Sequence, residues 1–146
     1  EDAFYQGTSP GGGAVVLREK PRRIVPANPS TTDLVLALVD PDRIVGLPIT
    51  ANSYSHELAV SEISVNLPTF TRYVAEGILA LEPDLVIGHV YQEPGTTRVL
   101  RRAGVPVYSL DYPKSAEDVI ASFEDLSELL GERENAQCGR GARAAL

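Results

Sequence analysis

The chain has 146 residues, enough for one domain with a substantial core, and its 13 Lys and Arg against 20 Asp and Glu give a net charge of −7. No basic cluster is denser than Arg22-Arg23 or Arg101-Arg102, which argues against nucleic acid as a partner because phosphate neutralisation needs a concentrated basic surface. The longest apolar run, residues 34–39, falls far short of the ~20 residues of a membrane span, and Cys138, the only cysteine, excludes an internal disulfide and a cysteine-based metal cluster.

The first predicted elements are a flexible tail and two short strands. Residues 1–13 contain Gly11-Gly12-Gly13, and ordering such a glycine-rich segment costs much conformational entropy, so we expect a tail. Apolar runs follow at residues 14–17 and 23–27, separated by Glu19-Lys20-Pro21. They predict two strands joined by a turn.

A helix is expected to begin at Pro29-Ser30, because the serine offers a cap and Asp33 places a carboxylate near the helix N-terminus. Its apolar face is formed by Leu34, Val35 and Leu38. Residues 44–47 predict the next strand.

The stretch from Pro48 to Tyr73 shows no clear periodicity, and a connection of this length inside a compact domain is usually functional or disordered. It holds a mixture of aromatic and polar side chains: Tyr54, His56, Phe70, Arg72 and Tyr73. That mixture favours a functional loop.

The second half alternates again between helices and strands. Residues 75–81 predict a helix, 84–88 a strand covered on both faces, 94–103 a helix and 105–110 another strand. The last helix begins after a cap at Ser115 and ends at Gly131. Its apolar face is expected to comprise Val119, Phe123, Leu126 and Leu130.

This alternation predicts an α/β fold, a three-layer sandwich around a mainly parallel central sheet, with residues 14–131 as one domain. Residues 132–146 are either the start of a further helix or a disordered end. Ligands of such sheets gather outside the carboxyl ends of the strands. Those ends are residues 27–30, 48–50, 89–92 and 111–113.

Sequence signatures of an enzyme or of a bound cofactor are absent: there is no nucleophile elbow, HExxH motif or phosphate loop. Ser30, His89 and Asp111 are the residue types of a catalytic triad, but any α/β domain supplies such a set by chance. His56 and His89 are weak candidates for a metal site, since their spacing is not that of metal ligands. We therefore expect a binding protein and no enzyme.

Aromatic residues accumulate in the loops at the predicted ligand end: Tyr54, Phe70, Tyr73, Tyr91 and Tyr112. Large rings give flat contact area to a ligand at low entropic cost, but they also pack domain interiors. Both interpretations stay open for each ring.

Two segments resemble the periplasmic binding proteins for cobalamin, ferric siderophores and haem. The first is Arg23-Ile24-Val25-Pro26-Ala27-Asn28-Pro29-Ser30, followed by the apolar helix and Asp42-Arg43-Ile44-Val45-Gly46. The second, Glu76-Gly77-Ile78-Leu79-Ala80-Leu81-Glu82-Pro83-Asp84-Leu85-Val86-Ile87, is similar to the family's E-x-I-x-A-L-x-P-D-L-V-I signature. The resemblance covers about residues 14–137 and implies the amino-terminal lobe of a class III binding protein, with residues 132–146 starting the helix that connects two lobes.

The resemblance implies that a small molecule binds in the cleft between the lobes and is delivered to a membrane permease of an ABC importer. The implied ligand-binding residues are Asn28, Pro29, Thr50, Tyr54, Thr71, Arg72, His89 and Tyr91. Thr71 and His89 stand near places where the cobalamin binder carries tryptophan, and this chain has none, so a ferric siderophore or haem is favoured over a corrinoid. Arg72 suits a carboxylate or catecholate oxygen, and Tyr54, Tyr91 or His89 suit haem iron.

Glu76 aligns with the family's glutamate that docks onto permease arginines, although a carboxylate in a first helical turn is also favourable by itself. The resemblance implies a periplasmic or extracellular location, with a lipid anchor on the full-length precursor as an open question. Self-association of an isolated lobe stays open too. The alternatives from other classes are a stand-alone α/β regulatory or interaction domain and a metal-receptor lobe that uses His56 and His89.

Overall fold

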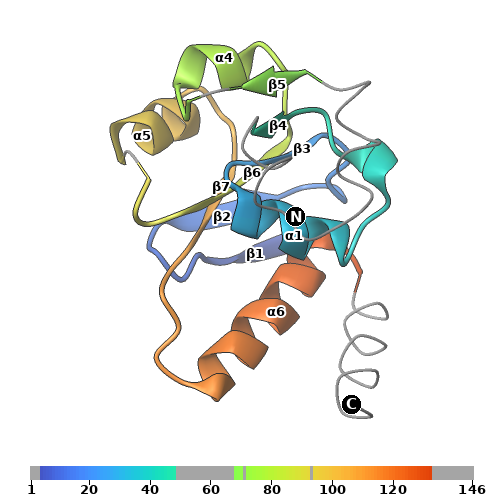
Figure 1. Cartoon of the computed structure of the whole chain (residues 1–146), viewed down its shortest axis with the longest axis vertical. Coiled ribbons are helices and arrows are strands. Elements are labelled where there is room, and N and C mark those ends of the chain that lie inside the picture. The colour runs from blue at the N-terminus through green and yellow to red at the C-terminus, as the bar shows by residue number, and fades with distance from the viewer. Residues whose placement is uncertain (1–3, 49–67, 71, 93, 133–146) are drawn as a thin grey trace.

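The computed structural model describes residues 4–48, 68–70, 72–92 and 94–132 (Figure 1). Thr50, Tyr54, His56 and Thr71 lie outside these residues, so the predictions made for them stay predictions. Along the described chain, no helix combines the length and the apolar character needed to cross a bilayer.

The centre of the fold is a three-stranded parallel sheet in the order β3-β6-β7. Its strands are β3 (Ile24–Pro26), β6 (Leu85–His89) and β7 (Val107–Leu110). All three were predicted from continuous apolar runs, which are typical of strands covered on both faces. Every described residue of these strands is buried except His89, which is half-buried at the end of β6.

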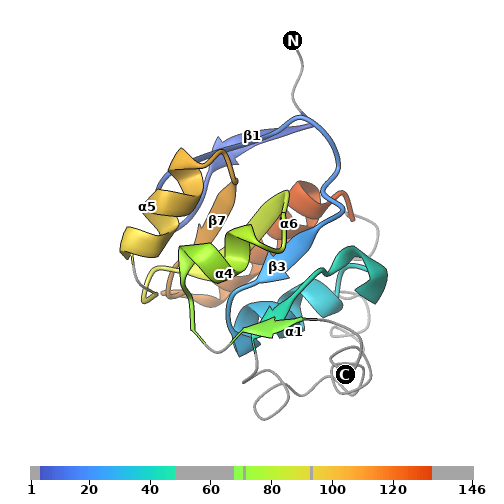
Figure 2. The same cartoon turned by 90° about the horizontal axis from the view of Figure 1, so that it is seen from above.

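Helices cover both faces of this sheet (Figure 2). They are α1 (Pro29–Leu36), α4 (Ala75–Leu79), α5 (Pro94–Arg102) and α6 (Ala116–Leu130). Alternate strand residues join two core clusters: Leu85 and Ile87 pack with α1 and α6, whereas Val86 packs with α4 and α5. The predicted α/β sandwich with a mainly parallel sheet is therefore confirmed.

Two further pairings flank the centre. Ile44 forms an isolated parallel bridge with Ile24, and the short strand β4 (Leu47–Pro48) pairs in parallel with β5 (Thr69–Phe70). The predicted strand at residues 44–47 is thus reduced to a bridge and a two-residue strand. A short 3₁₀ helix at Pro41–Arg43 precedes it.

The prediction of a flexible tail is wrong for the described part of residues 1–13. Strand β1 (Tyr5–Thr8) pairs antiparallel with β2 (Ala14–Leu17), and the glycines form the turn between them. Gly12 and Gly13 adopt φ values of 102° and 95°, which favour glycine. Tyr5 is only 7% exposed and packs in the core cluster of α1 and α6. Apolar burial of this kind offsets the entropy that the composition alone suggested would prevent ordering.

The two strands predicted at residues 14–17 and 23–27 are present, but they do not pair with each other. β2 pairs with β1, and β3 pairs with β6. The Gly11 amide donates to the Ser109 carbonyl oxygen at 2.7 Å, so the hairpin turn contacts the free edge of β7. Tyr5 donates to a carboxylate oxygen of Asp125 in α6 at 2.9 Å, which ties the other end of the hairpin to that helix.

The predictions for α1 and α6 agree with the structure except at the cap of α1 and on the buried face of α6. Ser115 caps α6 by accepting from the Asp118 amide, and Gly131 ends it at φ 74°, both as predicted. The cap of α1, however, is Asn28 and not Ser30. Val119 is 48% exposed and does not belong to the buried face of α6, which is formed by Phe123, Leu126, Ser127, Leu129 and Leu130.

Candidate functional site

The candidate site lies where β3, β6 and β7 end. These strands are parallel, so their carboxyl ends meet at one edge of the sheet. Asn28 follows β3, His89 ends β6 and Tyr91 lies two residues beyond it. Three of the predicted ligand-binding residues thus lie at this edge. Pro29 begins α1 next to Asn28, and its side chain lies outside the described residues.

Asn28 is held in place by the start of α1. Its side-chain oxygen accepts from the Thr31 amide at 3.0 Å, while the Asn28 amide donates to the Thr31 hydroxyl at 3.2 Å. This reciprocal pair is a capping box, with Thr31 in the place of the usual Glu or Gln. Both residues are at least 95% buried, so the cap geometry is rigidly packed.

Gln92 links the ends of β3 and β6 and was not predicted as a site residue. Its side-chain oxygen accepts from the Asn28 side-chain amide and from the His89 backbone amide, both at 3.1 Å. Its side-chain nitrogen donates to the Ala27 carbonyl oxygen at 3.1 Å. The only sequence signal was its place among residues 89–92 at a strand end. We call the pair Asn28 and Gln92 the amide clamp.

His89, Tyr91 and Tyr112 form an aromatic platform at the same edge. The His89 ring stacks on Tyr91 with centroids 4.6 Å apart and meets the edge of Tyr112 at 4.7 Å. Tyr91 is 56% exposed and Tyr112 is 62% exposed, so both rings present apolar surface to solvent. Tyr112 was one of the aromatic residues for which ligand contact and packing were both open, and the structure places it beside two predicted ligand residues.

Burial is the main electrostatic influence on the platform. It lowers the pKa of His89 below its ordinary value, and the negative charge of Asp111 opposes this effect only in part. Burial also raises the pKa of Tyr91, with a smaller contribution from Tyr112. The imidazole is therefore neutral at physiological pH, and the Tyr91 phenol keeps its proton.

An apolar pocket of about 210 Å³ opens beneath His89, on the side of α1 and α6. Its lining is mostly aliphatic or aromatic and includes Leu34, Leu110 and Phe123. The imidazole therefore forms part of the wall of this apolar hollow. The combination of exposed rings and an adjacent apolar hollow suits the flat face of a large organic ligand.

Arg72 and Tyr73 lie in the connection between β5 and α4. Arg72 is exposed, and its guanidinium makes no hydrogen bond or ion pair with any residue that the structure describes. Tyr73 packs against the core cluster of α4 and α5, and its hydroxyl lies 2.8 Å from the Thr97 hydroxyl. Burial raises the Tyr73 pKa. Tyr73 is therefore a packing residue, and the ligand role predicted for Arg72 stays a prediction. Phe70 likewise packs against that cluster.

Glu76 is exposed in the first turn of α4. α4 lies on the opposite face of the sheet from α1 and α6, as Figure 1 shows. Nothing in the described structure tests docking onto a permease.

The described residues contain no group of three or more His, Cys, Asp or Glu side chains that could hold a metal ion. His56 lies outside them, so the proposed pair of His56 and His89 is not tested. Of the residues of catalytic-triad type, Ser30 has a side chain that also lies outside the described residues. The Asp111 side chain accepts a hydrogen bond from the Tyr112 amide at 2.7 Å.

Relatives of the chain agree with this architecture. The family model described as periplasmic binding protein matches residues 24–138. The chain is 28% identical over 129 residues to an uncharacterised ABC transporter substrate-binding lipoprotein, YvrC, of Bacillus subtilis, covering 84% of this chain and 38% of the relative. It is 27% identical over 118 residues to a cobalamin-binding protein of Halobacterium salinarum, covering 81% of this chain and 31% of the relative.

Among solved structures, a periplasmic heme binding protein from Pseudomonas aeruginosa superimposes with a TM-score of 0.70 at 29% identity, over 86% of this chain and 44% of that one. The chain therefore spans less than half the length of these relatives. Because the family model covers most of the sequence and the solved relative shares its fold, this chain belongs to the periplasmic binding protein family.

Proposed function

We propose that this chain is the amino-terminal lobe of the substrate-binding component of an ABC importer, and that it binds one face of an iron chelate or related macrocycle. Haem fits best, with a ferric siderophore or a corrinoid as relatives of the same ligand class. The importer role is supported by the B. subtilis lipoprotein, and the ligand class by the heme- and cobalamin-binding relatives.

The observation that carries the proposal is the aromatic platform. Tyr91 and Tyr112 expose more than half of their surface at the ligand edge of the sheet, and His89 fixes both through ring contacts. Exposed aromatic rings held rigidly in place lose little entropy when they stack on a planar ligand. The amide clamp supports the platform from below, since Gln92 accepts from the His89 backbone amide.

The hydrogen bonds of His89 favour Tyr91 as the ligand of haem iron. The Tyr91 amide donates to Nδ1 of His89 at 3.4 Å, so the neutral imidazole carries its proton on Nε2. An Nε2 that carries a proton offers no lone pair to a metal. The Tyr91 hydroxyl is exposed, and tyrosine is a known axial ligand of ferric haem. Because its pKa is raised, iron binding would release the phenol proton.

Glu76 on α4 would contact the permease in this scheme, and the protein would act outside the cytoplasmic membrane. An exposed carboxylate suits arginines on a partner, because charge complementarity speeds association. The test is a Glu76→Gln exchange in the complete importer, which should slow transport without changing ligand affinity.

The direct test is titration of the chain with haemin, a ferric hydroxamate and a ferric catecholate, monitored by haem absorbance or tyrosine fluorescence. A single lobe leaves one ligand face in water, so we expect weaker binding than in a closed two-lobed cleft. Tyr91→Phe should remove the phenolate-to-iron absorption band and weaken haemin binding by about tenfold or more, equivalent to ~1.4 kcal/mol.

Tyr112→Phe is the matched control, because it keeps the platform ring and removes only a hydroxyl. Haemin bound to this variant should retain the wild-type spectrum. Identical spectra for wild type, Tyr91→Phe and Tyr112→Phe would exclude Tyr91 as the iron ligand. If none of the three chelates binds, the ligand class itself is wrong.

A further inference from the structure

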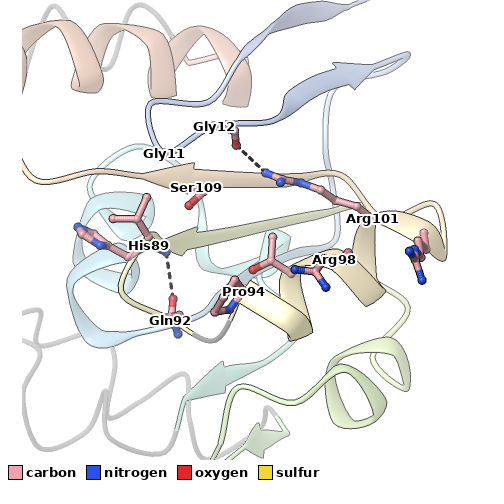
Figure 3. A pocket seen from close by; sticks show the side chains of 11 residues that line it. Gly11, Gly12, His89, Gln92, Pro94, Arg98, Arg101 and Ser109 are labelled. Atoms are coloured by element: carbon pink, nitrogen blue, oxygen red, sulfur yellow. Dashed lines mark hydrogen bonds between the residues drawn. The ribbon is translucent and has the colours of Figure 1, made fainter.

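A second cavity lies beside the platform, between the turn of the hairpin and α5 (Figure 3). Its volume is about 490 Å³, which is within the range of small-molecule sites. It extends from His89 and Gln92 at the ligand edge to the last turn of α5. We call it the arginine cavity, after Arg98, Arg101 and Arg102 in its lining.

The charge of this cavity is opposite to that of the chain. The whole sequence carries a net charge of −7, yet none of the described residues that line the cavity is acidic. No ion pair connects these arginines to a carboxylate among the residues that the structure describes. The helix dipole accounts for basic residues in the last turn of α5, but Arg98 precedes that turn.

Ser109 contributes a hydroxyl to the same cavity. The residue is only 8% exposed, and its hydroxyl makes no hydrogen bond with any residue in the described part of the chain. Because this hydroxyl faces the cavity, it can donate to a ligand there. In Figure 3, Ser109 lies between the hairpin turn at Gly11 and the helix that carries Arg98. In the sheet register Ser109 pairs with Gly88 of the neighbouring strand β6.

One arginine of the cavity is held by hydrogen bonds, and the other two are exposed. Arg101 donates from one terminal nitrogen to the carbonyl oxygens of Gly12 and Val107, at 2.9 and 3.0 Å, while its buried Nε has no partner among the described residues. Arg101 therefore holds the hairpin turn against β7 and keeps an uncompensated positive charge there. Arg98 and Arg102 are exposed and can adjust to a ligand.

From this arrangement we infer that the arginine cavity is a binding site for an oxyanion, a carboxylate or phosphate group. The planar guanidinium of arginine matches the oxygens of both groups, and the Ser109 hydroxyl supplies a further donor. A bound anion would compensate the charge of Arg101 and give the Ser109 hydroxyl an acceptor. The anion is either a free small molecule or an acidic arm of a ligand held on the adjacent platform.

The first test is calorimetric titration of the chain with inorganic phosphate at ionic strength held constant with NaCl. Arg98→Gln should weaken phosphate binding by about tenfold, since hydrogen bonds to charged groups are among the strong ones. Arg22→Gln is the matched control, because Arg22 is exposed elsewhere and its loss changes the net charge equally.

Ser109→Ala separates binding from folding. The variant should weaken phosphate binding by a similar factor, while its melting temperature without phosphate stays the same because no hydrogen bond within the described structure is lost. A melting temperature that falls without phosphate would mean that Ser109 already has a partner and would overturn its assignment as an anion donor.

The second test distinguishes the two sources of the anion and depends on the proposed function. Haemin and its dimethyl ester, which lacks free carboxylates, are compared on wild type and Arg98→Gln. If Arg98→Gln weakens the binding of haemin but not the binding of its dimethyl ester, the anion is a carboxylate arm of the platform ligand. Phosphate binding that requires Arg98, without any haem binding, would preserve the inference and reject the proposed ligand. If neither phosphate nor haemin responds to Arg98→Gln, the arginine cavity is not an anion site.

Discussion

Replacing Asn28 by alanine tests how strongly the ligand edge is held together. The exchange removes the side-chain acceptor for the Thr31 amide and the donor for the Gln92 side-chain oxygen. The Thr31 amide then has no acceptor at the cap. Because Thr31 is completely buried, water cannot take the place of the lost side chain.

The expected loss in free energy of unfolding follows from these two lost hydrogen bonds. An N-cap exchange to alanine costs about 1 kcal/mol, with a range of ~0.5–2 kcal/mol. The lost bond to Gln92 adds ~0.5–1.5 kcal/mol, and a donor left unsatisfied in a buried position costs at the upper end of such values. We expect Asn28→Ala to lower the free energy of unfolding by about 2–3.5 kcal/mol, a large part of the ~5–15 kcal/mol of a typical domain.

The assay is urea unfolding followed by circular dichroism. Ser115→Ala removes the equivalent cap of α6 at an exposed position and should cost only about 1 kcal/mol. Asn28→Asp keeps the cap acceptor but places an oxygen opposite the side-chain oxygen of Gln92. It should therefore lower the free energy of unfolding by an amount between those of Asn28→Ala and Ser115→Ala. A loss for Asn28→Ala no greater than that of Ser115→Ala would refute the argument that burial and the amide clamp increase the cost.

Two further predictions concern the hairpin turn and the platform. A Cβ at Gly11 would lie 2.2 Å from a Val90 methyl carbon, so Gly11→Ala should destabilise the chain by about 1–3 kcal/mol through overpacking. In contrast, a Cβ at Gly77 in α4 meets only an ordinary contact at 3.8 Å, so Gly77→Ala should stabilise the chain by ~0.5–1 kcal/mol in the same urea unfolding experiment. Equal effects of the two exchanges would contradict the close packing of the turn. For His89, burial lowers the folded-state pKa below 6.5, so the unfolded chain binds more protons in the interval just below pH 6.5 and stability should decrease as the pH falls through it. His89→Gln should remove this part of the pH dependence in unfolding curves from pH 7 downward, and an unchanged curve would show that Asp111 offsets the effect of burial.

The sequence alone determined most of the backbone of the central sandwich. Continuous apolar runs predicted β3, β6 and β7, and the signals at Ser115 and Gly131 predicted both ends of α6. These features depend on nearest neighbours along the chain: apolar periodicity, a capping side chain and a left-handed glycine. The strand ends therefore also located Asn28, His89 and Tyr91 at one edge.

Only the tertiary structure decided which side chains meet there. The amide clamp joins residues 64 positions apart, and its formation depends on β3 lying next to β6 in the sheet order. The same is true of the hairpin, which is ordered because Tyr5 packs in a core built from distant helices. It is also true of the arginine cavity, where Ser109 and Arg98 come together across different elements. Local sequence patterns set which residues favour a strand or a helix, but the packing of distant elements selects the partners of each polar group, and it is those partners that make a site.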